Sequence, residues 1–187
     1  MNYNFLKDYK NIVFDYDGTI SRIPIDWLMI RSEFISFAYN TFEFTFEKSL
    51  RVDEMETVLI SEFPTNIKRI FEFRSKVETI YNGKHINNKK LIDHIIEANA
   101  NLFIVSNNLK STVCRNITEL GIMHKFKKII GCDSYYSIKP STLSWQKLVS
   151  EFDLKTSDTL IVGDSPQTDG VYAKNIGLPY FQIPSFR

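Results

Sequence analysis

Glycine is scarce in this chain, and its distribution gives the first indication of the fold. The 187 residues include seven glycines, and none lies between Gly18 and Gly83. Glycine supplies many of the tight turns that bound short strands, so a sheet is not expected in that stretch. After Gly83, glycine returns between apolar runs. The distribution predicts a helical segment followed by a part in which helices and strands alternate.

Long apolar runs and an excess of charge are also missing. No apolar stretch approaches the roughly 20 residues that cross a bilayer. The first residues lack the basic start and long apolar segment of a signal peptide. The formal net charge of +1 gives no electrostatic reason to bind nucleic acid or an anionic membrane. We therefore expect a cytoplasmic globular protein with neither of these partners, and the sequence favours no particular oligomeric state.

Cysteine is equally rare. The two cysteines, Cys114 and Cys132, form no close-spaced metal-binding motif. In a cytoplasmic setting two such residues are usually free thiols rather than a disulfide. The three histidines, His85, His94 and His124, are scattered without ligand spacing, which favours surface or core positions.

A short apolar run followed by two aspartates is the most informative stretch. Residues 12–14 are Ile-Val-Phe, which is typical of a buried strand. Asp15 and Asp17 follow, and then Gly18 and Thr19. In a parallel sheet, ligands bind just beyond the carboxyl ends of the strands. The two acids therefore occupy a position where binding and catalysis are common.

The spacing of the two aspartates suggests a bound cation. Alternation along an extended chain puts Asp15 and Asp17 on the same side. Two carboxylates so close both stay charged only with a cation near them, and Mg²⁺ prefers such oxygen ligands. Gly18 allows the chain to turn sharply. The simpler alternative is a strand followed by an Asp-Gly turn with solvated acids.

Residues 22–83 are predicted to form an inserted bundle of three or four helices. Pro24 and Pro64 mark breaks, and apolar residues recur at helical spacing between them. Phenylalanine also alternates at positions 42, 44 and 46, so a short strand there is an alternative. The apolar positions at helical spacing are Trp27, Ile30, Phe34, Phe37, Ala38, Leu50, Met55, Val58, Leu59, Ile67, Ile70, Phe71, Phe73, Val77 and Ile80.

From Gly83 onward, helices and strands alternate. Helices are predicted over 89–99, 111–120, 141–152 and 168–175, and strands over 102–105, 128–131, 159–162 and 180–183. Strands that alternate with helices of this length favour a parallel sheet covered by helices on both faces. The predicted fold class is thus α/β, with a Rossmann-like parallel sheet and a helical insertion after the first strand.

Further polar residues stand at the ends of these predicted elements. Because parallel strands end at the same edge of the sheet, the residues are expected to converge with Asp15 and Asp17 on one pocket. They are Ser106 and Asn107 after the second strand, Lys139 before the helix over 141–152, Asp164 after the fourth strand, and Asp169 five residues later.

The acids and the lysine of this set suit phosphoryl transfer. Asp15 can attack phosphorus to form an aspartyl phosphate, and Asp17 can protonate the leaving oxygen and then activate water. Lys139 can pair with the nucleophile and the phosphate. Asp164 and Asp169 can hold Mg²⁺.

The remaining residues are predicted to bind phosphate or substrate. Ser106 can donate hydrogen bonds to phosphate oxygens beside the N–H groups of a helix start, and Asn107, Gly18 and Thr19 are grouped with it. Each residue also has an ordinary alternative, such as an N-cap, a solvated lysine or a plain turn. Their joint occurrence at strand ends favours the catalytic interpretation.

The sequence resembles the haloacid dehalogenase-like hydrolase superfamily. The resemblance is carried by Asp15-Tyr16-Asp17-Gly18-Thr19, Val105-Ser106-Asn107, Lys139-Pro140 and Gly163-Asp164-Ser165-Pro166-Gln167-Thr168-Asp169. It implies the roles argued above, Mg²⁺ as cofactor, and a backbone carbonyl ligand from Asp17. It also implies that residues 1–21 and 84–187 form the α/β core and that residues 22–83 form a helical cap, as in members similar to phosphoglycolate phosphatase and β-phosphoglucomutase.

The second aspartate narrows the reaction that the resemblance implies. Dehalogenases of the superfamily lack it, so Asp17 favours phosphoryl transfer over carbon–halogen cleavage. A Mg²⁺-dependent phosphatase of a small phosphorylated metabolite is the leading hypothesis. A phosphomutase that uses the same residues and a non-catalytic binding protein are the alternatives. Arg22 is expected at the mouth of the site, and the basic residues that could grip an anionic substrate are Arg51, Lys68, Arg69, Arg74 and Lys76.

Overall fold

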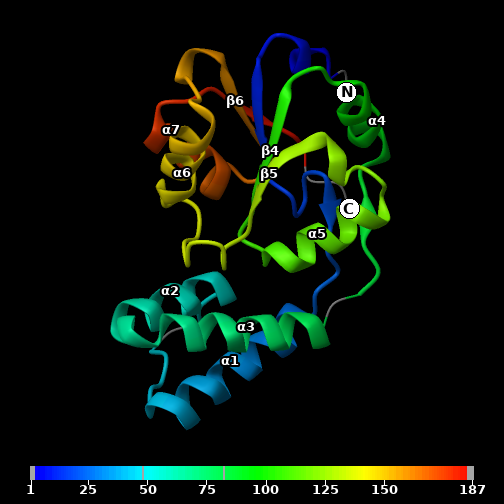
Figure 1. Cartoon of the computed structure of the whole chain (residues 1–187). Coiled ribbons are helices and arrows are strands. Elements are labelled where there is room, and N and C mark those ends of the chain that lie inside the picture. Colours follow the sequence, from blue (N-terminus) through cyan, green and yellow to red (C-terminus); the bar gives the residue numbers. More distant parts are fainter. Residues whose placement is uncertain (1–2, 48, 82, 185–187) are drawn as a thin grey trace. The chain divides into compact units, whose positions relative to one another are not determined.

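The chain divides into two compact units in the computed structural model (Figure 1), which describes residues 3–47, 49–81 and 83–184. The first unit runs up to Ile23 and resumes at His85, and the second is Pro24–Lys84. The chain leaves the first unit after Ile23 and returns to it at His85, and the segments just before and after these two points pair with each other. There the two-residue strands β2 (Ser21–Arg22) and β3 (Ile86–Asn87) pair antiparallel. This pairing was not predicted, because strands of two residues carry no periodic signal.

The first unit is built on a five-stranded parallel sheet in the order β5-β4-β1-β6-β7. This confirms the predicted α/β class. The central strand β1 is buried along its whole length, which explains its continuous apolar sequence. The strands are β1 (Asn11–Phe14), β4 (Asn101–Val105), β5 (Phe126–Ile130), β6 (Thr159–Gly163) and β7 (Tyr180–Gln182).

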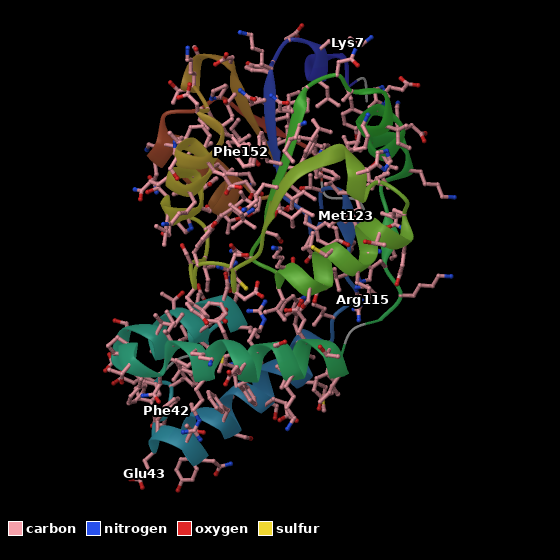
Figure 2. The ribbon with its side chains drawn as sticks, in the orientation of Figure 1. Lys7, Phe42, Glu43, Arg115, Met123 and Phe152 are labelled. Atoms are coloured by element: carbon pink, nitrogen blue, oxygen red, sulfur yellow. The ribbon has the colours of Figure 1, made fainter. Side chains whose placement is uncertain are left out.

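Helices cover both faces of this sheet. In Figure 1, α6 (Leu143–Phe152) and α7 (Val171–Ile176) lie on one side of it, and α4 (Lys89–Glu97) and α5 (Lys110–Glu119) lie on the other. Trp145 and Leu148 of α6 pack with Val13 and Phe103 of the sheet. Phe152, labelled in Figure 2, packs edge to face on Phe103, with ring centroids 5.1 Å apart.

Short turns complete the first unit. The predicted helix over 168–175 begins as a π-helical turn, Pro166–Gly170, before α7. The other short turns are 3₁₀ segments over Asn4–Lys7, Met123–Lys125 and Thr156–Asp158. Cys114 and Cys132 are not joined in a disulfide. None of the described helices combines the length and the apolar character that a bilayer crossing requires.

The second unit is helical. It contains α1 (Trp27–Phe42), α2 (Val52–Glu62) and α3 (Ile67–Ile80), with a 3₁₀ turn at Pro64–Asn66 between the last two. Asp26 caps α1 by accepting a hydrogen bond from the N–H of Met29. The core residues are Ile30, Phe34, Ala38, Met55, Leu59, Ile70, Phe71 and Val77.

The alternative of a strand at residues 42–46 is wrong. Phe42 and Glu43, labelled in Figure 2, mark the end of α1, where Glu43 adopts a left-handed conformation with a φ of 53°. The chain beyond it is irregular. Phe44 and Phe46 contact each other edge to face and line a pocket of about 390 Å³ within this unit.

Candidate active site

Three parallel strands end side by side, and each end carries a predicted site residue. Asp15 follows β1, Ser106 follows β4, and Asp164 follows β6. β1 lies between the other two strands. The ladder continues one step past β1, since the N–H of Asp15 donates to the carbonyl of Val162 at 2.8 Å. Residues far apart in the sequence therefore meet at one edge of the sheet.

Three carboxylates gather at this edge. One oxygen each from Asp15, Asp164 and Asp169 lies within 4.8 Å of the other two. Asp15 and Asp169 are buried, and Asp164 is half-buried. Ionised carboxylates this close repel one another strongly, so positive charge has to accompany them.

Lys139 supplies part of that positive charge. Its Nζ lies 2.6 Å from Asp15 Oδ1 and 2.6 Å from Asp169 Oδ1, and its side chain is buried. Burial alone would lower the pKa of Lys139, but the charges of the two carboxylates outweigh it and raise the pKa above its usual value. Lys139 is therefore an ammonium ion held between two acids.

The cluster still carries an excess of negative charge, because three carboxylates face one ammonium. Burial raises the pKa of Asp15 to about 7, against the opposing charge of Lys139 and with a further contribution from Asp169. A divalent cation that prefers oxygen ligands fits the donor set in both charge and chemistry. Asp15, Asp164 and Asp169 would hold it.

Two glycines allow the acids to approach so closely. Gly18 has a φ of 85°, which favours glycine, and a Cβ at this position would overlap the carboxylate of Asp164. A Cβ at Gly163 would overlap the carboxylate of Asp169. Alanine at either position would have to displace an acid of the cluster.

The Asp15 carboxylate is held at both of its oxygens. Oδ1 faces Lys139, and Oδ2 accepts a hydrogen bond from the hydroxyl of Thr19 at 3.1 Å. Thr19 is fully buried. This residue was predicted to bind phosphate, and in the structure its hydroxyl orients Asp15.

The Asp17 carboxylate has a different partner. Its Oδ1 accepts a hydrogen bond from the N–H of Ile23 at 2.8 Å, and it is not one of the three clustered carboxylates. The chain turns directly after Tyr16, whose carbonyl accepts hydrogen bonds from the N–H groups of residues 19, 20 and 21. The extended-chain argument for two adjacent side chains around one cation does not describe this turn. The backbone carbonyl ligand from Asp17 stays a prediction.

The Asn107 side chain forms two hydrogen bonds with the backbone of Lys139. The N–H of Lys139 donates to Asn107 Oδ1 at 2.7 Å, and Asn107 Nδ2 donates to the carbonyl of Lys139 at 3.3 Å. The neighbouring Ser106 hydroxyl donates to Asn108 Oδ1 at 3.1 Å and accepts from the N–H of Asn108 at 3.1 Å. Direct phosphate contacts by Ser106 and Asn107 stay predictions, and the structure adds a supporting role for the Asn107 amide.

The basic residues that were predicted to contact substrate differ in their exposure to solvent. Arg22 is exposed on β2, opposite Ile86, and its substrate contact stays a prediction. Arg74 was predicted as a possible substrate ligand, and this is wrong because it is buried. Its guanidinium lies 2.7 Å from Glu56 Oε2 and 3.1 Å from Glu78 Oε2. Burial raises the pKa of Glu56 to about 7, despite the charge of Arg74.

Comparison with known proteins agrees with this geometry. The family model described as haloacid dehalogenase-like hydrolase matches residues 12–183, which is nearly the whole chain. The chain belongs to the haloacid dehalogenase-like hydrolase family. The resemblance predicted from the four short motifs is thereby confirmed.

The three similar proteins described next are distant from this chain in sequence. A phosphoglycolate phosphatase of Vibrio parahaemolyticus is 28% identical over 95 residues, which is 51% of this chain and 41% of that protein, so the match spans about two fifths of the relative's length. A solved haloacid dehalogenase-like hydrolase from Bacteroides fragilis has a TM-score of 0.65 at 19% identity, covering 95% of this chain and 88% of that one. A solved protein from Haemophilus somnus, described as a predicted phosphoglycolate phosphatase, has a TM-score of 0.61 at 20% identity, covering 95% of this chain and 90% of that one. At these identities the two structures show the shared fold.

Several residues around the site were missed by sequence reasoning. Tyr16, His85 and Asn116 form a hydrogen-bonded group, and Asn88 contacts the loop that carries the aspartates. No spacing rule could have found them, because their contacts depend on which strands become neighbours. The only local signal was the position of Tyr16 between Asp15 and Asp17.

Proposed function

We propose that this protein is a Mg²⁺-dependent phosphatase that hydrolyses a small phosphorylated metabolite through an aspartyl phosphate on Asp15. The observation that carries the proposal is the Asp15 carboxylate, which is fixed at both oxygens by Lys139 and Thr19. A nucleophile oriented in this way needs little reorganisation before it attacks.

The first step transfers the phosphoryl group to the protein. An oxygen of Asp15 attacks phosphorus, and the bond between phosphorus and the leaving oxygen breaks. The leaving oxygen takes the electron pair and receives a proton from Asp17. Asp17 is suited to this role because it is near the nucleophile in sequence but outside the clustered carboxylates.

The second step releases phosphate. Water attacks phosphorus while Asp17, now ionised, takes its proton. The bond from phosphorus to Asp15 then breaks, which gives inorganic phosphate and restores the free carboxylate. The same residue thus acts as acid in one step and base in the next.

The surrounding charges stabilise the transferring group. Lys139 supplies a fixed positive charge whose position is held by Asn107. Ser106 and the N–H groups at the start of α5 are proposed to bind phosphate oxygens. Mg²⁺ held by Asp15, Asp164 and Asp169 would offset negative charge on both the acids and the phosphoryl group.

The second unit, Pro24–Lys84, is proposed to act as the cap that supplies substrate contacts and limits access of water. Its predicted boundary, residues 22–83, is close to that of the compact unit. The Vibrio relative is described as a phosphoglycolate phosphatase. Phosphoglycolate is accordingly one member of the substrate panel rather than the assigned substrate.

Hydrolysis of p-nitrophenyl phosphate with and without Mg²⁺ tests the proposal. Turnover that needs Mg²⁺ and is lost in Asp15→Asn, but kept in the surface variant Asp93→Asn, is expected. A panel of phosphorylated metabolites that includes phosphoglycolate then identifies the substrate. Phosphoryl return to a second substrate hydroxyl without phosphate release would indicate a mutase. Folded wild-type protein that turns over none of these compounds would contradict the proposal.

A further inference from the structure

The tyrosine between the two aspartates contacts two elements that are distant in the sequence. Tyr16 has no solvent exposure, and its hydroxyl donates a hydrogen bond to Oδ1 of Asn116 in α5. The same hydroxyl lies 3.0 Å from Nδ1 of His85. A phenolic hydroxyl has a single proton. Since Asn116 receives that proton, His85 has to donate from Nδ1 to the tyrosine oxygen.

His85 begins a segment that contacts the loop after β1, residues 15–21, at several points. Asn87 Oδ1 accepts a hydrogen bond from the hydroxyl of Ser21 at 2.7 Å. Asn88 donates from its backbone N–H to the carbonyl of Ile20 at 3.0 Å, and from Nδ2 to the carbonyl of Thr19 at 3.1 Å. The segment 85–88 therefore holds the loop that follows β1 along most of its length.

This loop carries the groups that the proposed reaction uses. Thr19 holds Asp15 by its hydroxyl, and Asp17 lies between Tyr16 and Gly18. Within the loop, the N–H of Gly18 donates to the carbonyl of Ser21 at 2.8 Å. A shift of the Tyr16 ring would move the backbone on which both aspartates stand.

We propose that His85 is a positioning residue, which holds Tyr16 against Asn116 and thereby fixes the loop that presents Asp15 and Asp17. The kinetic consequences of this inference rest on the proposed phosphatase function. The positions of Tyr16 and the loop can be tested without any turnover. The contact by which His85 acts on the loop is that of its Nδ1 with the Tyr16 hydroxyl.

Kinetics of four variants test the path through Tyr16. His85→Leu and Tyr16→Phe should each lower kcat about tenfold with little change in KM, because misplacing catalytic groups slows the chemical step. The double variant should be no slower than either single one. His85→Gln keeps an N–H donor and should retain most of the activity. The matched control His124→Leu, at an exposed histidine, should behave as wild type.

A measurement without turnover separates this inference from the proposed function. In amide NMR spectra, His85→Leu should shift the resonances of Gly18 and Ile23, whose N–H groups donate to Ser21 and Asp17, while His124→Leu should not. Unchanged Gly18 and Ile23 resonances, or additive kinetic losses in the double variant, would overturn the positioning role. Shifted resonances in a protein that hydrolyses no phosphate ester would support it and count against the phosphatase function alone.

Discussion

The Nζ atom of Lys139 lies 2.6 Å from Oδ1 of Asp15, although the two residues are 124 positions apart in the sequence. The same atom lies 2.6 Å from Asp169 Oδ1. One buried ammonium thus joins the carboxylate that follows β1 to an acid beyond β6. This contact links the predicted motifs into a single site, and most of the expected properties of the site depend on it.

Removal of the ammonium should abolish most of the activity. Lys139→Met leaves two buried acids without their cation, so hydrolysis should fall by a hundredfold or more, on the order expected for loss of a transition-state charge partner. Stability without Mg²⁺ should fall by about 3 kcal/mol, because breaking a buried ion pair leaves an uncompensated charge. Steady-state kinetics and chemical unfolding measure both effects. Lys155→Met, at an exposed lysine, is the control and should behave as wild type. If Lys139→Met hydrolyses substrate within threefold of the wild-type rate, the proposed role of Lys139 is refuted.

The hydroxyl of Thr19 should matter for orientation rather than binding. Thr19→Val keeps the side-chain shape but removes the hydrogen bond to Asp15 Oδ2. A loss of about tenfold in kcat with an unchanged KM is expected, as for an interaction worth about 1 kcal/mol or slightly more. Thr79→Val, on the exposed face of α3, serves as the control. An equal effect of both substitutions on kcat would show that Thr19 has no special role.

Mg²⁺ should bind to the acidic cluster in the absence of substrate. Because a ligand that binds only the folded state stabilises it, Mg²⁺ should raise the melting temperature of the wild-type protein. Asp164→Asn removes one of the three clustered carboxylates and should weaken Mg²⁺ affinity at least tenfold by calorimetry. Asp93→Asn should leave the affinity unchanged. Equal affinity in wild type and Asp164→Asn would place the ion elsewhere.

Glu56, a buried acid of the second unit, should make stability depend on pH. The pKa of Glu56 is raised from an ordinary value near 4.5 to about 7 in the folded protein. A raised carboxyl pKa gives stability that is complete below the unfolded pKa and lost as pH rises through the folded pKa. A shift of this size corresponds to about 3 kcal/mol between pH 5 and pH 8.

Comparison with Glu56→Gln isolates this contribution from other titrating groups. Chemical unfolding at several pH values should show wild type losing stability relative to Glu56→Gln between pH 5 and pH 8. Glu62→Gln, at an exposed position of α2, should follow wild type at every pH. If wild type and Glu56→Gln show the same pH dependence, Glu56 does not titrate in this range.

The parts of the fold that the sequence predicted are those with strong local patterns. The buried run at residues 12–14 became the central strand β1, because a strand whose two faces are both covered by helices needs apolar residues throughout. The helices of residues 24–84 followed from apolar spacing in the same way. The alternation of phenylalanines at 42, 44 and 46 suggested a strand that does not form, because Glu43 ends α1 in a left-handed turn and an irregular loop follows.

The site was predicted in outline but not in its contacts. Residue type and position at strand ends were enough to bring Asp15, Lys139, Asp164 and Asp169 together. The partner of Asp17 and the bond from Asn107 to Lys139 depend on turn geometry, which spacing does not encode. The burial of Arg74 was likewise hidden, because its partners Glu56 and Glu78 come from two different helices.

Chemical trapping of the phosphorylated protein tests the central claim most directly. Wild-type protein mixed with a turned-over phosphate ester and Mg²⁺, quenched in acid and digested, should carry a phosphoryl group on the peptide that contains Asp15. Mass spectrometry should locate the group on that side chain, and Asp15→Asn should show neither label nor turnover. A label on any other residue, or full hydrolysis by Asp15→Asn, would contradict the account.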